Sequence, residues 1–256
     1  MADQIITAAM LAIGDELLSG RTKDKNIGHL ADILLLSGID LKEVRIVADE
    51  EDAIVAALNA LRGAYDYVFT SGGIGPTHDD ITADAVSKAF GVACEHEAEA
   101  MRIMAEMYER RGMPFTEARQ RMARLPVGST HIANPVSTAP GFAIGNVFVM
   151  AGVPQVFQAM LDNVMPTLRT GTPMLSTAIP CPFGEGDIGT PLGLIQKAHP
   201  DTSIGSYPRY LGQTFSTEIV VRARAEMPMQ AAAEEVRQMI ETIRQAKVQE
   251  NHSAEA

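Results

Sequence analysis

Three loops of this sequence gather residue types that could bind and cleave a phosphate compound. Each loop follows an apolar, strand-like run: Gly14-Asp15-Glu16 follows the first run, Asp49 the second, and the segment 71–80 the third. In an open α/β sheet, ligands bind in the crevice outside the carboxyl ends of the strands. Because all three loops lie at such ends, we expect them to meet at one site.

The third loop, SGGIGPTHDD, is the most informative of the three. Gly72, Gly73 and Gly75 would let the backbone approach a ligand and turn its N–H groups toward a phosphate. Asp79 and Asp80 would repel that phosphate unless a divalent cation lay between them, as Mg²⁺ does when carboxylates and substrate oxygens share it. Alternatively, Asp79 or Asp80 is the N-cap of the next helix. Spacing alone favours the cap, and both roles can hold at once.

The remaining motifs are weak when they are taken alone. Gly14-Asp15-Glu16 is a common strand end, and Asp49–Asp52 is also an ordinary acidic helix start. His78 has no second histidine at ligand spacing, which favours an exposed loop residue. Gly186–Gly189 has the G-x-x-G form of a nucleic-acid-binding KH loop, but Asp187 stands where such a loop needs basic residues. We therefore expect no nucleic-acid partner.

Composition excludes several classes of protein. The 256 residues include 21 Lys+Arg and 32 Asp+Glu, so the net charge is −11, which argues against binding to nucleic acid or an anionic membrane. No apolar run approaches the roughly 20 residues that span a bilayer, and the N-terminal run lacks the basic segment of a signal peptide. Two cysteines cannot form a zinc ribbon or a disulfide scaffold. We expect a cytoplasmic protein without a membrane partner.

The first two-thirds of the sequence alternates strand-like and helix-like segments. Strands are expected over 5–13, 41–48, 65–70 and on both sides of Gly145-Asn146 within 142–150. Helices are expected over 26–37, 51–61, 81–90, 95–124 and 153–168. This alternation predicts an α/β fold with a mostly parallel sheet and right-handed crossovers.

Four turn-forming residues, Thr170-Gly171-Thr172-Pro173, predict a domain boundary after the last of these helices. Beyond it the pattern predicts a small α+β unit, with strands over 175–180, 203–207 and 215–223 and helices over 192–198 and 229–247. The expected domains are therefore 1–169 and 174–248, followed by a polar, disordered tail over 249–256.

Three segments resemble the molybdopterin-binding fold shared by MoaB, MogA, the central domain of MoeA and CinA. They are Gly14–Gly20 (GDELLSG), Thr70–Thr82 (TSGGIGPTHDDIT) and Asn134–Phe142 (NPVSTAPGF). GGIGPTHDD and APGF are most similar to the amino-terminal part of CinA, and the resemblance covers about residues 5–168. It implies a three-layer α/β/α domain followed by a smaller KH-like α+β domain.

The resemblance also implies what the loops bind. CinA-type members are described as metal-dependent ADP-ribose pyrophosphatases, so a nucleotide-like pyrophosphate or a pterin, namely molybdopterin, is the expected ligand. The deamidase domain that follows in full-length CinA has no counterpart in these 256 residues. Nicotinamide mononucleotide deamidation is therefore not expected.

Carried over residue by residue, the resemblance marks Asp49 and Asp80 as the functional pair. Asp80 would hold the metal, with Asp49 as second ligand or as base for the attacking water. The residues expected to bind substrate or phosphate are Gly14, Asp15, Glu16, Ser19, Asn26, Ser71, Gly72, Gly73, Gly75, Pro76, Thr82, Gly152 and Pro154. Ala151 replaces the first proline of the family's Pro-Gly-x-Pro turn, and Ser137 stands where CinA usually has glycine.

Three functions remain open at this stage. The leading one is cleavage of a pyrophosphate in ADP-ribose or a similar nucleotide, dependent on Mg²⁺ or another divalent metal. The second is a molybdopterin-binding module of molybdenum-cofactor biosynthesis, and the third is a non-catalytic oligomeric scaffold.

The segment 95–124 also bears on assembly. Its apolar residues could line a subunit contact, because methionine-rich surfaces suit such contacts, or they could complete the core of one chain. These residues are Met101, Met104, Met107, Phe115 and Met122. The resemblance implies an oligomer as well, so we expect a homodimer.

Overall fold

The structure is a computed structural model that describes residues 5–211 and 214–254. The chain forms two compact units, Met1–Gly171 and Thr172–Ala256. None of the helices in the described ranges is long and apolar enough to cross a membrane.

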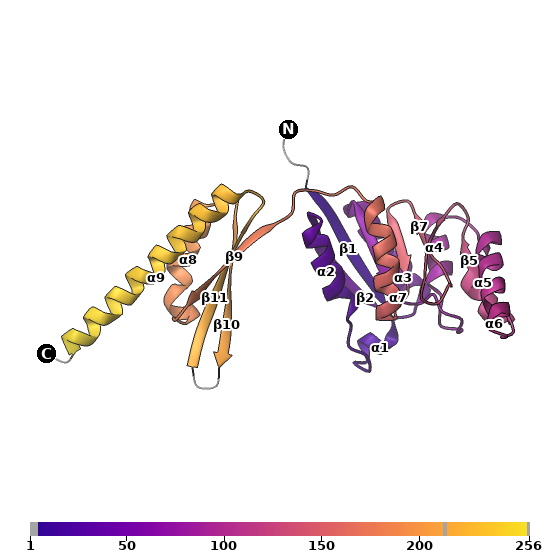
Figure 1. The fold of residues 1–256 in the computed structure, drawn as a ribbon, viewed down its shortest axis with the longest axis horizontal. Coiled ribbons are helices and arrows are strands. Elements are labelled where there is room, and N and C mark those ends of the chain that lie inside the picture. Colours follow the sequence, from indigo (N-terminus) through magenta and orange to yellow (C-terminus); the bar gives the residue numbers. More distant parts are fainter. Residues whose placement is uncertain (1–4, 212–213, 255–256) are drawn as a thin grey trace. The chain divides into compact units, whose positions relative to one another are not determined.

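The first unit is built on a six-stranded sheet with the order β2-β1-β3-β8-β7-β6 (Figure 1). Its strands are β1 (Ile6–Ile13), β2 (Ile39–Val47), β3 (Tyr67–Ser71), β6 (Thr130–Ile132), β7 (Gly141–Ile144) and β8 (Val147–Met150). Strands β2, β1, β3 and β8 run parallel, whereas β7 pairs antiparallel with both β8 and β6. The loops that follow β1, β3 and β8 therefore open at one edge of the sheet.

Helices cover both faces of this sheet. One face carries α3 (Glu51–Ala64), α4 (Thr82–Phe90) and α5 (Ala98–Arg110), and the other carries α2 (Asn26–Leu36) and α7 (Pro154–Val164). Neighbouring residues of β1 serve opposite cores, because successive side chains of a strand point to opposite faces: Leu11 packs with α3, and Met10 packs with α2. The predicted three-layer α/β/α architecture is confirmed.

The segment 95–124 is not one helix. Helix α5 ends at Arg110, and Gly112, with φ 62°, and Pro114 then break the helical path. Two short helical segments follow, α6 (Glu117–Gln120) and the 3₁₀ turn η1 (Arg121–Ala123). The chain then enters β5 (Arg124–Pro126), which pairs antiparallel with β4 (Cys94–His96). The prediction of a continuous helix was wrong because two strong breakers outweigh the helical periodicity.

The methionines of this segment belong mainly to the core of one chain. Met104 is fully buried within the α3–α5 core, and Met107 is buried as well. Met101, Phe115 and Met122 pack partly buried against the same core. Assigning Met104 to a subunit contact was therefore wrong, and the core interpretation holds for it. The homodimer itself stays a prediction.

The second unit is a three-stranded antiparallel sheet of order β10-β11-β9 with two helices. Its elements are β9 (Leu175–Cys181), α8 (Glu185–Ala198), β10 (Ser203–Leu211), β11 (Thr214–Ala223) and α9 (Glu226–Ala254). Ile219 and Val221 of β11 pack against Ile188 of α8 and Val236 of α9. The smaller α+β unit is confirmed.

Two details of this unit differ from the sequence expectations. Gly186–Gly189 lies inside α8 with Ile188 buried, so it is not a G-x-x-G loop, and Asp187 forms an ion pair with Lys247 at 2.7 Å. The expected tail over 249–256 is instead helical as far as Ala254, where α9 ends; residues 255–256 lie outside the described ranges.

Replacing Met104 tests the core assignment. We expect Met104→Ala to lower the free energy of unfolding by about 2–5 kcal/mol, because it leaves a cavity in a packed core. Met113→Ala is the matched control, since Met113 is 40% exposed and its loss should change stability by less than about 0.5 kcal/mol. Urea denaturation measures both values. A Met104→Ala variant of unchanged stability that dissociates a dimer in light scattering would restore the subunit-contact interpretation.

Candidate functional site

The ends of β1, β3 and β8 meet at Gly72 so closely that a side chain does not fit between them. A Cβ atom at Gly72, whose φ is 111°, would overlap the carbonyl oxygen of Ile13. One at Gly152 would lie 3.3 Å from the Cα of Gly72. The Gly72 N–H donates to the carbonyl of Met150 at 3.2 Å, which continues the pairing of β3 with β8. Gly72 is therefore required for close packing. We had expected its N–H to face a phosphate, but this N–H is already bonded to Met150.

Thr82 holds the next part of the loop against the start of α4. Its buried hydroxyl donates to the Gly72 carbonyl at 3.0 Å, and its N–H donates to the Gly73 carbonyl at 3.0 Å. Gly73 has φ 68°, and a Cβ there would overlap the Thr82 hydroxyl. Within residues 5–211 and 214–254, the N–H groups of Gly73, Ile74 and Gly75 have no acceptor. Three consecutive donors thus remain for a ligand.

These three residues line a cavity of about 490 Å³, a volume typical of small-molecule sites. It is bounded by the glycine loop on one side and by the turn that begins α7 on another. The lining residues are Glu16, Thr22, Gly72, Gly73, Ile74, Gly75, Asp80, Met122, Asn134, Ser137, Ala139, Ala151, Gly152, Val153, Pro154 and Val156.

The Asp80 carboxylate lies at the wall of this cavity and does not cap α4. Its Oδ2 accepts hydrogen bonds from the Thr77 N–H at 2.8 Å and the Thr77 hydroxyl at 2.5 Å. Asp80 also packs so closely on Gly75 that a Cβ there would lie 2.5 Å from Oδ2. Helix α4 begins at Thr82 with Ile81 at the N-cap and no side-chain cap. The capping alternative for Asp79 or Asp80 is wrong.

Asp49 brings the first two loops together behind the cavity wall. Its Oδ2 accepts a hydrogen bond from the Asp15 N–H at 3.0 Å. Partial burial raises the pKa of Asp49, and the negative charges of Asp15, Glu16 and Asp79 raise it further, against the lowering effect of that hydrogen bond. Asp79 belongs to the third loop, so negative charges from the first and third loops both act on Asp49. Glu16 lines the cavity, whereas Asp49 does not.

Asn26 fixes the loop ends from the other face of the sheet. This side chain, only 2% exposed, donates from Nδ2 to the Ser71 Oγ at 2.7 Å and to the Gly152 carbonyl at 2.8 Å. Asn26 therefore ties the start of α2 to the end of β3 and to the turn after β8.

The structure does not bring every expected residue to the cavity. Ser19, at the end of α1 (Asp15–Leu18), and Pro76 are exposed and do not line it, and neither does Asp15. Pro154 does, as the first residue of α7. His78 is exposed. Six lining residues were not predicted from the sequence: Thr22, Met122, Asn134, Ala139, Val153 and Val156. Two of them, Asn134 and Ala139, lie in the motif NPVSTAPGF.

The donor set suits a metal ion that is shared with a ligand. In the part of the chain that the structure describes, no three His, Cys, Asp or Glu side chains gather as a metal-binding group. Two carboxylates, Glu16 and Asp80, do line one cavity. One or two carboxylates completed by phosphate oxygens are the usual ligands of Mg²⁺ in phosphate-processing sites.

Comparison with known proteins identifies similar chains for both units. Residues 9–170 match the family described as "Probable molybdopterin binding domain", and residues 173–248 match "FAD synthase, middle domain". A protein of Pyrobaculum arsenaticum is 36% identical over 211 residues, which cover 79% of this chain and 80% of that protein.

Two relatives are named CinA. A CinA-like protein of Citrifermentans bemidjiense is 39% identical over 165 residues, which cover 62% of this chain but 40% of that protein. The crystal structure of CinA from Thermoplasma acidophilum has 30% sequence identity and a TM-score of 0.59, and the match covers 64% of this chain and 98% of that one. This chain therefore spans less than half of the CinA-like protein.

Substitutions at two glycines beside α4 distinguish the cost of backbone strain from the cost of losing the contact with Thr82. Gly73 and Gly91 both have φ 68°, but a Cβ at Gly91 meets open space. We expect Gly91→Ala to lower the free energy of unfolding by about 1–2 kcal/mol, the cost of a left-handed conformation. Gly73→Ala should cost at least about 1 kcal/mol more, because it displaces the Thr82 hydroxyl from its hydrogen bond. Equal losses in urea denaturation would contradict this role of Thr82.

The raised pKa of Asp49 predicts a pH-dependent stability effect. The folded state disfavours the charged carboxylate, so the charge of Asp49 lowers the free energy of unfolding at neutral pH. This destabilisation disappears as pH falls through the folded-state pKa toward the ordinary value of 3.8. Asp49→Asn keeps an acceptor for the Asp15 N–H and removes the charge. We expect a small rise in melting temperature at pH 7 and none at pH 3. Differential scanning fluorimetry across this range measures it, and a lower melting temperature at pH 7 would contradict the electrostatic argument.

Proposed function

We propose that this chain, which belongs to the family of probable molybdopterin-binding domains, binds a phosphate-bearing nucleotide in the cavity and hydrolyses its pyrophosphate with a divalent metal ion. The observation that carries this proposal is the composition of one cavity wall. Three N–H donors without acceptors, from Gly73 to Gly75, lie beside two carboxylates, Glu16 and Asp80. N–H donors bind anions and carboxylates bind cations, so this wall is suited to a phosphate that carries a metal ion.

The Gly73–Gly75 amides would bind the phosphate oxygens. They precede α4, whose N-terminal end carries a partial positive charge that favours an anion. Backbone donors held by Thr82 are pre-organised, so they can stabilise the charge that develops on phosphorus oxygens during hydrolysis without a conformational rearrangement.

The rest of the cavity would hold the organic part of the ligand. Met122, Ala139, Val153 and Val156 supply apolar surface, and Asn134 adds a polar side chain. A largely apolar wall with a few polar groups is typical of small-molecule sites and suits a planar heterocycle.

The divalent ion would be held by Glu16 and Asp80 together with the phosphate oxygens. When bound, it would supply positive charge to the phosphoryl group and polarise it toward attack. We assign Asp49 a positioning role, because it contacts Asp15 and does not line the cavity. From there it fixes the loop that presents Glu16.

Molybdopterin binding is the second candidate, and the family match over residues 9–170 favours it. A pterin phosphate could use the same amides and the same apolar wall, and it would need neither carboxylate. Titration calorimetry with ADP-ribose, FAD and molybdopterin, each with and without Mg²⁺, distinguishes the two functions. Molybdopterin binding without Mg²⁺, combined with uncleaved ADP-ribose, would favour the second candidate over the first.

Asp80→Asn tests the catalytic proposal. The variant keeps the size of the side chain and an oxygen that can accept from Thr77, so the loop should fold normally. Because it removes the charge that a metal ion needs, we expect Mg²⁺-dependent cleavage of ADP-ribose to fall at least about 100-fold with a melting temperature close to the wild-type value.

Asp162→Asn is the matched control, since Asp162 is exposed on α7 away from the cavity lining. Its turnover, measured by chromatography of the products, should equal that of the wild type. Full activity in Asp80→Asn would refute the role of Asp80 in catalysis.

A further inference from the structure

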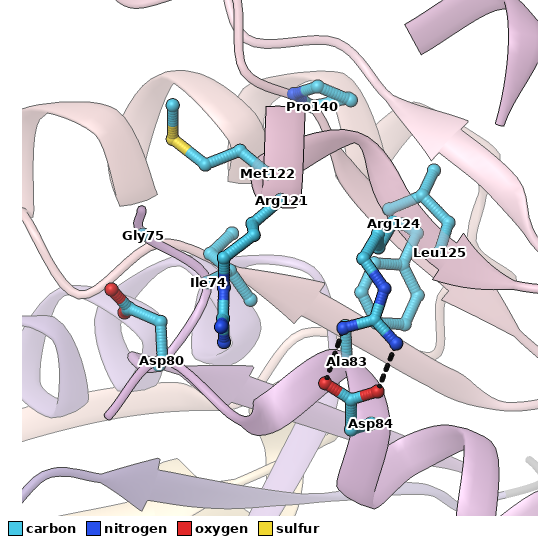
Figure 2. A pocket seen from close by; sticks show the side chains of 12 residues that line it. Ile74, Gly75, Asp80, Ala83, Asp84, Arg121, Met122, Arg124, Leu125 and Pro140 are labelled. Carbon is cyan, nitrogen blue, oxygen red and sulfur yellow. Dashed lines mark hydrogen bonds and ion pairs between the residues drawn. The ribbon is translucent and has the colours of Figure 1, made fainter. Parts of the chain in front are cut away.

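A small recess of about 20 Å³ lies beside the glycine loop and is lined by two arginines (Figure 2). It shares five residues with the main cavity: Gly73, Ile74, Gly75, Asp80 and Met122. A space of this size holds one water molecule or one ligand oxygen atom, and no ring. The recess is therefore an extension of the ligand site that admits a single polar atom.

One of the two arginines is fully engaged. Arg124 of β5 donates from Nη1 and Nη2 to the two carboxylate oxygens of Asp84 in α4, at 3.0 and 2.7 Å. This two-point pair leaves neither the Asp84 carboxylate nor the Arg124 charge without a partner. Arg124 thus joins the β4–β5 ribbon to α4.

The other arginine has no such partner. Figure 2 shows the Arg121 side chain extending past Ile74, with Asp80 on one side of its guanidinium and Asp84 on the other. Across residues 5–211 and 214–254, no carboxylate lies within 4.0 Å of the Arg121 guanidinium, and its N–H groups meet no acceptor. The guanidinium of Arg121 carries five donors and is only partly buried, so its donors are open to an oxygen acceptor from solvent or from a ligand.

We propose that Arg121 binds a phosphoryl oxygen of the ligand in this recess. This proposal rests on the proposed function, from which it takes the position of the ligand. It adds Arg121 as a residue that sets the preference for phosphorylated ligands. Arg121 and the amides of Gly73–Gly75 present only donors to the shared space. An oxygen-rich anion accepts from both sets and also neutralises the Arg121 charge, whereas a neutral acceptor of the same size only accepts hydrogen bonds, which are weaker.

Arg121 also offsets the charge of the cavity. Glu16 and Asp80 repel a phosphate when no metal ion is present, and the whole chain carries a net charge of −11. Arg121 is the cation at this wall whose charge is not already neutralised by a carboxylate of the described residues. Its contribution should therefore be clearest when phosphate binding is measured without a metal.

The test is calorimetric titration of the full chain with inorganic pyrophosphate in EDTA. We expect wild-type binding and a loss of about 10- to 100-fold in affinity for Arg121→Gln, the effect of removing a hydrogen bond between charged groups. Arg121→Lys should fall between the two, because it keeps the charge and loses the planar fork. Arg111→Gln is the matched control, since it removes the same charge from an exposed residue outside both spaces, and its affinity should match the wild type.

The outcomes separate this inference from the proposed function. Undiminished pyrophosphate affinity in Arg121→Gln would overturn the role of Arg121, while wild-type cleavage of ADP-ribose would leave the proposed function standing. Absence of wild-type binding to both pyrophosphate and ADP-ribose would overturn both. If Arg121→Gln melts well below the wild type, Arg121→Met removes the charge in a side chain of similar reach and gives an independent value.

Discussion

The close backbone contact at Gly72 is the constraint on which the site depends. Because no side chain stands there, the last carbonyl of β1 and the turn after β8 can both approach the end of β3. The pairing of β3 with β8 ends at the Gly72 N–H, which donates to Met150. The loop leaves the sheet at the next residue, so the amides of Gly73, Ile74 and Gly75 lose their strand partners together. The row of donors is a direct consequence of where the ladder stops.

Groups of both signs of charge lie around this site. Burial raises the pKa of Asp49, and the negative charges of Asp15, Glu16 and Asp79 raise it further. The recess beside the cavity is lined by the glycine loop and Arg121 together with Asp80 and Asp84. A ligand with phosphate oxygens and an associated cation complements groups of both signs, whereas a purely cationic or purely anionic ligand complements groups of only one sign. This arrangement accounts for acidic residues in a loop whose backbone attracts anions.

The sequence predicted those parts of the fold whose signals are local. The apolar run of β1, the helical spacing of α2 and the Gly145-Asn146 turn between β7 and β8 each depend on a few neighbouring residues. The prediction of one helix over 95–124 was wrong because Gly112 and Pro114 interrupt the helical path although the apolar period continues. Helix α8 begins at Glu185, before its expected start at 192, because packing of Ile188 in the core stabilises a helix over Gly186–Gly189.

Much of the candidate site could be predicted from the sequence, and the rest depends on tertiary structure. The predicted residues Glu16, Gly72, Gly73, Gly75, Asp80, Gly152 and Pro154 do line one cavity. That the Gly72 N–H is occupied follows from β8 lying beside β3, which no local pattern reveals. Arg124 and Asp84 are 40 residues apart, so their pairing, which leaves Arg121 as the available cation, appears only in three dimensions.

The reliance on main-chain donors has an evolutionary consequence. Among substitutions in the Gly73–Gly75 loop, only one to proline deletes a backbone N–H, so these donors persist while neighbouring side chains change. Met122, Ser137 and Val153 face the same cavity from other segments and take no part in the contacts at Gly72. With the proposed function, drift at these three positions would exchange one heterocycle for another above the same backbone donors, and a single scaffold would gain several ligands.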